Sequence, residues 1–153
     1  MSCRFMPERI LVAFDDSPSA RRALDLACDL ALKYDAELQV LHVVRDMSGG
    51  LHPEWLKKFA DLEHLDVRDA LWSLGDEVAR AGLQRAQGRG VAAVTGKVRI
   101  GEPAEEIRDH ALETQADLII MGRRGLGSVE ALLLGSVSAS VTQISPCSCV
   151  TVT

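Results

Sequence analysis

The chain has 153 residues, of which 47% are hydrophobic and 25% charged, values typical of one globular domain. Its net charge of −5 argues against non-specific nucleic-acid binding, which needs a basic surface, and its longest apolar runs are too short to cross a bilayer. Because no secretion signal follows Met1, we expect a single cytoplasmic domain over residues 1–153, with no membrane or nucleic-acid partner.

The first third of the chain predicts a strand, a helix and a second strand. Residues 9–14 form a compact apolar run. Ser17 then offers a helix cap and is followed by a proline, which favours the first turn of a helix. Alanine and leucine recur at helical spacing as far as Lys33, and residues 37–44, which are rich in valine and leucine, predict the second strand.

The rest of the chain continues the alternation of helices and strands. Apolar residues at helical spacing between Pro53 and Gln84 predict an amphipathic helix, whole or broken, which the glycines at 88 and 90 end. The later elements are a strand at 91–100, a helix from Gly101, a strand at 118–121, a helix at 135–144 and a strand at 148–153. This alternation favours a parallel sheet covered on both faces, with ligands beyond the carboxyl ends of its strands.

The segment after the strand at 118–121 has the spacing of a phosphate-binding loop. Two residues separate Gly122 from Gly125, and nine more precede Gly135 and Ser136. Glycines let backbone N–H groups surround an anion, and Ser136 lies at an expected helix N-terminus, which favours negative charge. The same glycines could be ordinary turn residues, so the pattern alone leaves both interpretations open.

On these features the chain resembles the universal stress protein family, ATP-binding subgroup, over nearly its whole length. The shared segments are residues 10–15 followed by Ser17, residues 41–43, Gly101 with Pro103, and residues 121–125 with the later Gly135 and Ser136. The resemblance implies an α/β, three-layer αβα protein of the nucleotide-alpha-hydrolase-like fold. It also implies a five-stranded parallel sheet in the order 3-2-1-4-5, and homodimers joined through Val150 to Thr153.

The resemblance further implies which residues bind ATP. Asp15 and the main chain of Val43 would contact the adenosine part, with Met121 close by. The ribose and phosphates would be held by Gly122, Gly125, Gly135, Ser136, Val137 and Ser138. A carboxylate would repel a triphosphate, which is consistent with Asp15 at the nucleoside end. Asp15 could instead cap the first helix, and Ser136 and Ser138 could cap the helix that they begin.

Several other polar residues have two interpretations. Arg123 and Arg124 could screen phosphate charge or remain solvated. His42 invites a catalytic role, but its place in an apolar strand favours a structural one. Cys147 and Cys149 could form a redox pair, but packing is the better interpretation. We therefore assign no catalytic residue and no metal ligand.

The expected function is regulatory. ATP, with or without Mg²⁺, would order the segment between Gly122 and Gly135 and so alter the surface offered to an unidentified protein partner or to the dimer mate. Two alternatives stay open. One is a slow ATPase or phosphotransferase with Glu130 as a candidate base, and the other is a nucleotide-independent dimeric scaffold. Neither a P-loop nor a dinucleotide-binding motif is complete in this chain.

Overall fold

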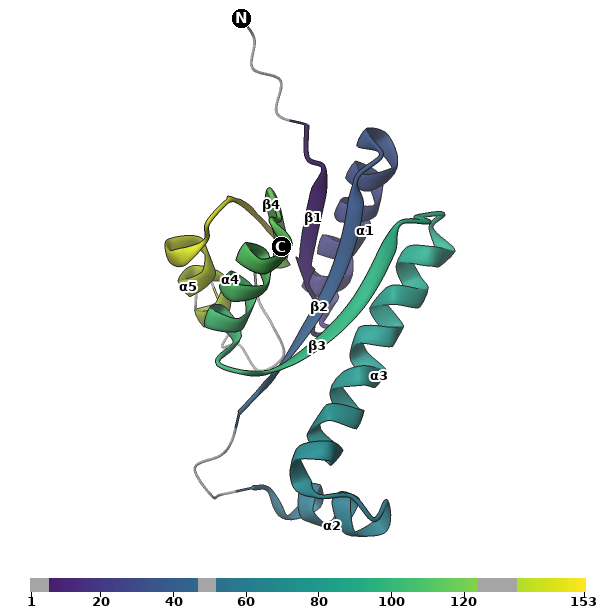
Figure 1. Cartoon of the computed structure of the whole chain (residues 1–153), viewed down its shortest axis with the longest axis vertical. Coiled ribbons are helices and arrows are strands. Elements are labelled where there is room, and N and C mark those ends of the chain that lie inside the picture. Colours follow the sequence, from purple (N-terminus) through teal and green to yellow (C-terminus); the bar gives the residue numbers. More distant parts are fainter. Residues whose placement is uncertain (1–5, 47–51, 124–134) are drawn as a thin grey trace, which may run out of the picture.

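The computed structural model describes residues 6–46, 52–123 and 135–153, which form a parallel sheet between two layers of helices (Figure 1). In chain order the elements are β1 (Arg9–Ala13), α1 (Pro18–Tyr34), β2 (Glu37–Arg45), α2 (Glu54–Leu62), α3 (Val67–Gly88), β3 (Val94–Gly101), α4 (Pro103–Thr114), β4 (Leu118–Gly122), α5 (Ser136–Ile144) and β5 (Ser148–Val152). Within the described residues the sheet has five strands in the order β3-β2-β1-β4-β5, which confirms the expected fold.

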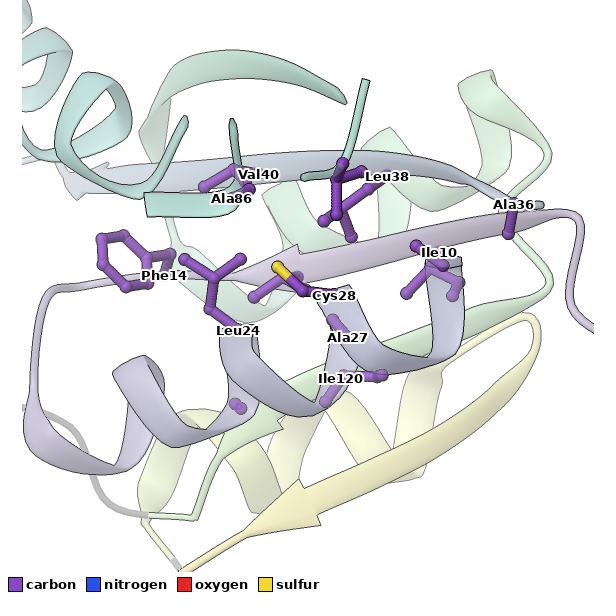
Figure 2. Close-up of a cluster of buried hydrophobic side chains, with 14 of the residues drawn as sticks. Ile10, Phe14, Leu24, Ala27, Cys28, Ala36, Leu38, Val40, Ala86 and Ile120 are labelled. Carbon is purple, nitrogen blue, oxygen red and sulfur yellow. The ribbon is translucent and has the colours of Figure 1, made fainter. Parts of the chain in front are cut away.

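The central strand β1 contributes side chains to a separate core on each face of the sheet. Ile10 and Val12 belong to the cluster beneath α1 and α3, whereas Leu11 belongs to the cluster beneath α4 and α5. Figure 2 shows the first cluster, in which Leu24 and Cys28 of α1 point toward the sheet. Each fully buried aliphatic side chain contributes about 1.5–3 kcal/mol, so β1 is a rigid base for the residues that follow it.

The helical region after β2 is broken, as the sequence allowed. Asp66 caps α3, the second helix of this region, because its side chain accepts a hydrogen bond from the N–H group of Asp69. The resulting α3 lies so close to the sheet that a Cβ atom on Gly82 would come within 2.9 Å of the Phe14 ring. A longer side chain at this position would push the helix away from the sheet.

The third strand begins later than the sequence predicted. Val91 is buried, but its N–H group donates to the carbonyl of Ala86 and closes the turn after α3. Strand pairing with β2 therefore starts near Val94 and not at Val91. The prediction that the strand begins at residue 91 is therefore wrong.

No helix in residues 6–46, 52–123 or 135–153 has the length and apolar character needed to cross a membrane.

Candidate functional site

A cavity of about 330 Å³ opens at the carboxyl ends of β1, β2 and β4. The chain leaves β1 for β2 on one side and later crosses to β4 on the other, so the cavity lies where the winding of the sheet reverses. Its volume is at the lower end of the range for small-molecule sites. Eight of the nine residues assigned from the sequence line it: Asp15, Val43, Met121, Gly122, Gly135, Ser136, Val137 and Ser138. Gly125, like Arg124 and Glu130, is outside the described residues.

Asp15 leads from β1 into the first turn of α1, where it borders the cavity. Its carboxylate accepts a hydrogen bond from the N–H group of Ser17 at 3.0 Å. The cap of α1 is Ser17, whose hydroxyl accepts from the N–H group of Ala20 at 3.2 Å. The interpretation of Asp15 as the helix cap is therefore wrong. Its carboxylate is instead held at the cavity wall by the turn before the helix.

The edge of β2 is exposed to the cavity because β2 is longer than β1. The last paired residues of the two strands are Ala13 and Leu41, and the N–H group of Phe14 donates to the Leu41 carbonyl at 2.8 Å. Backbone groups on one edge of a parallel strand recur every second residue, so the next on this edge belong to Val43. No β1 residue pairs with Val43 in the register of the two strands. Its peptide groups can therefore serve a ligand.

The N-terminus of α5 also faces the cavity. Gly135 occupies the cap position and has no side chain to accept a hydrogen bond. Ser138 does not cap either, because its hydroxyl donates to the carbonyls of Gly135 and Arg123 at 3.1 and 3.0 Å. The prediction that Ser136 and Ser138 cap this helix is wrong, since Ser136 is its first helical residue. The first turn of α5 therefore lacks a side-chain cap, and its N–H groups favour an anion.

Gly122 has a packing role that the sequence did not reveal. A Cβ atom built on it would come within 2.8 Å of the Ala20 nitrogen and 2.9 Å of the Ser19 carbonyl carbon, and would also collide with the Ser19 hydroxyl. The close approach of β4 to the N-terminus of α1 therefore requires a glycine here, even without a ligand. The glycine spacing predicts a contact with a phosphate, whereas this contact is between two parts of the protein.

Arg123 is the residue whose importance the sequence understated. Its N–H group donates to the Val152 carbonyl at 2.6 Å, and its own carbonyl accepts from the N–H group of Gly135 at 2.7 Å. Arg123 lines the cavity, and its Nε atom is buried with no hydrogen-bond partner in the described part of the chain. A run of two arginines in a loop gives no signal of such burial.

His42, Cys147 and Cys149 make contacts that support a structural role. The Nδ1–H group of His42 donates to the Phe14 carbonyl at 2.8 Å, which fixes the ring against the main chain. Cys147 and Cys149 are free thiols that pack against the cluster beneath α4 and α5, and burial raises the pKa of Cys147. Cys147 lies just before β5 and not within it. Across the described ranges, no three His, Cys, Asp or Glu residues are grouped to hold a metal ion.

Comparison with known sequences gives a match along almost the entire chain. The universal stress protein family matches residues 6–153. The universal stress protein YxiE of Bacillus subtilis is 36% identical over 150 residues, which cover 93% of this chain and 96% of that protein. The universal stress protein Sll1388 of Synechocystis is 32% identical over 155 residues, covering 92% and 94%.

Solved structures give the same result for the fold. The universal stress protein UspA from Lactobacillus plantarum superposes with a TM-score of 0.77 at 25% identity, covering 95% of this chain and 97% of that one. A universal stress protein in complex with cAMP has a TM-score of 0.71 at 24% identity, covering 97% and 99%. The Archaeoglobus fulgidus protein in complex with dAMP has a TM-score of 0.67 at 21% identity, covering 97% and 100%.

Proposed function

Because the chain belongs to the universal stress protein family, we propose that it is an ATP-binding regulatory protein of the stress response. One observation carries the proposal. The cavity at the reversal of the sheet is bordered both by Asp15 and by the N-terminus of α5, which has no side-chain cap. Further support comes from the two fold relatives solved with cAMP and dAMP, because both ligands combine an adenine nucleoside with a phosphate.

The nucleoside would occupy the part of the cavity near β1 and β2. Asp15 can accept hydrogen bonds from ribose hydroxyl groups or from an amine, since an ionised carboxylate is an acceptor only. The free edge of β2 at Val43 offers one peptide donor and one acceptor to the rim of the base. Met121 and Ile107 supply apolar surface for the ring.

The phosphates would extend toward α5. The first-turn N–H groups of this helix and its dipole both favour negative charge. We assign Gly122, Gly135, Ser136, Val137 and Ser138 to this end, together with Gly125. Mg²⁺ would be coordinated mainly by phosphate oxygens and water, as Mg²⁺ usually is beside nucleotides.

The regulatory part of the proposal depends on β5. This strand pairs with β4 on one side and has no described strand on the other, so a second copy of the chain could extend the sheet there. We propose a homodimer through Val150 to Thr153, with nucleotide binding altering the surface offered to a protein partner. The three free cysteines in the described residues accord with a reducing compartment such as the cytoplasm.

The function is tested by calorimetric titration of the intact chain with Mg-ATP. We expect saturable binding by the natural protein and about tenfold weaker binding by Asp15→Asn, which loses a charge-assisted hydrogen bond but keeps a side chain of the same shape. Asp76→Asn, an exposed change on α3, is the matched control and should bind normally. The proposal fails if the natural protein gives no heat of binding and releases no adenine nucleotide on denaturation, as measured by mass spectrometry.

A further inference from the structure

We propose that Arg123 binds the phosphate chain of the nucleotide and thereby sets the preference of the cavity for phosphorylated ligands over adenosine. This inference rests on the proposed function, because it concerns the same cavity. It assigns a ligand contact to a side chain within the glycine pattern, between Gly122 and Gly125.

The first argument is the unsatisfied nitrogen of this side chain. The Nε atom of Arg123 is buried, and no acceptor reaches it from the described residues. A buried donor without a partner is rare, because it loses its bonds to water without replacing them. Arg123 is also one of the residues that line the cavity. A turn of the side chain toward the cavity would let an anionic oxygen there supply the missing acceptor.

The second argument is that the base of this side chain is held in place. Two main-chain hydrogen bonds fix the Arg123 residue, one to Val152 of β5 and one from Gly135 at the start of α5. The Ser138 hydroxyl adds a third contact on the Arg123 carbonyl. Binding an anion would therefore order only the side chain, and the free energy lost in fixing the residue is reduced.

The third argument is the balance of charge around the cavity. Arg45 also lines it, but its guanidinium lies 3.7 Å from the Glu102 carboxylate, which offsets the charge. None of the ion pairs that link described residues includes Arg123. Of the two described arginines that line the cavity, Arg123 is thus the one without an ion pair to a described residue.

The position of Arg123 beside α5 also suits a phosphate more than a carboxylate. The Arg123 carbonyl accepts hydrogen bonds from the first residues of α5, so the side chain begins beside the free N–H groups of that helix. A phosphate with three exposed oxygens can accept from both groups at once, and the arginine fork binds two oxygens of one phosphate. A lysine would keep the charge but lose this paired geometry.

The test compares four ligands on four proteins by calorimetry: adenosine, AMP, ADP and ATP against the natural chain, Arg123→Met, Arg123→Lys and Arg80→Met. Arg123→Met keeps much of the apolar stem and removes the charge. We expect it to bind the three nucleotides about 10- to 100-fold more weakly, the range for losing a hydrogen bond to a charged group, and adenosine within about twofold of normal. The affinity of Arg123→Lys for the three nucleotides should lie between those of the natural chain and of Arg123→Met.

Arg80→Met controls for the loss of an arginine, because Arg80 is exposed on α3 and pairs with Asp76. Circular dichroism establishes that each variant is folded before titration. Equal weakening for adenosine and ATP in both Arg123 variants would overturn the inference and give Arg123 a purely structural role, as would unchanged affinity for ATP. If the natural chain binds none of the four ligands, the proposed function fails together with the inference.

Discussion

Replacing Gly122 with alanine tests whether close packing of β4 on α1 positions the site. The added Cβ atom would lie 2.8 Å from the Ala20 nitrogen and 2.9 Å from the Ser19 carbonyl carbon, both backbone atoms at the start of α1. These atoms cannot rotate away as a flexible side chain would. Gly90 is the described glycine with a positive φ, so contact and not backbone conformation is the source of strain at Gly122.

We expect Gly122→Ala to lower the free energy of unfolding by about 1–3 kcal/mol, the usual range for overpacking a core. For a chain of this length the loss corresponds to a fall in Tm of about 2–12 °C. Urea denaturation followed by circular dichroism measures the first quantity, and calorimetry the second. Gly88→Ala is the control, since no heavy atom lies within 4 Å of its added Cβ, and it should be neutral or stabilising. A Gly122→Ala protein as stable as the natural one would refute the packing argument.

Two further predictions concern a buried thiol and the sheet edge. Burial raises the pKa of Cys28 to about 11, so the unfolded chain ionises this thiol at a lower pH than the folded chain does. The neutral thiol therefore contributes about 3 kcal/mol to the free energy of unfolding below pH 9, and this contribution is lost as the pH rises toward 11. Denaturant titrations between pH 8 and 11 should show this loss in the natural chain and not in Cys28→Ala, and parallel curves would contradict it. If β5 joins two copies, Thr151→Lys should convert a dimer to a monomer in analytical ultracentrifugation, because Thr151 is exposed on that strand and charge blocks edge pairing. An unchanged mass would exclude this edge as the interface.

The sequence predicted the order of helices and strands because each has a clear apolar period. Its errors lie where hydrogen bonding competes with that period. Val91 is apolar and buried, yet its N–H group closes a helix end, so the strand starts at Val94. The strand order followed from the family resemblance and not from periodicity, because pairing between distant segments leaves no mark in a local pattern.

The candidate site divides in a similar way. Asp15 follows the first predicted strand and Ser136 begins a predicted helix, so their positions in the sequence were enough to place both at the cavity. The direction of hydrogen bonds was not predictable, since a serine near a helix start can accept from an N–H group or, as Ser138 does, donate to a carbonyl. The Arg123 main chain is fixed between β5 and the start of α5, and no neighbour in sequence signals that these two segments meet there.

A crystal structure of the chain grown with Mg-ATP tests the central claim most directly. The account predicts electron density for the adenosine group between Asp15 and Val43, with the phosphates at the N-terminus of α5 near Ser136. An empty cavity in crystals that contain saturating nucleotide, or a nucleotide bound elsewhere on the molecule, would contradict it.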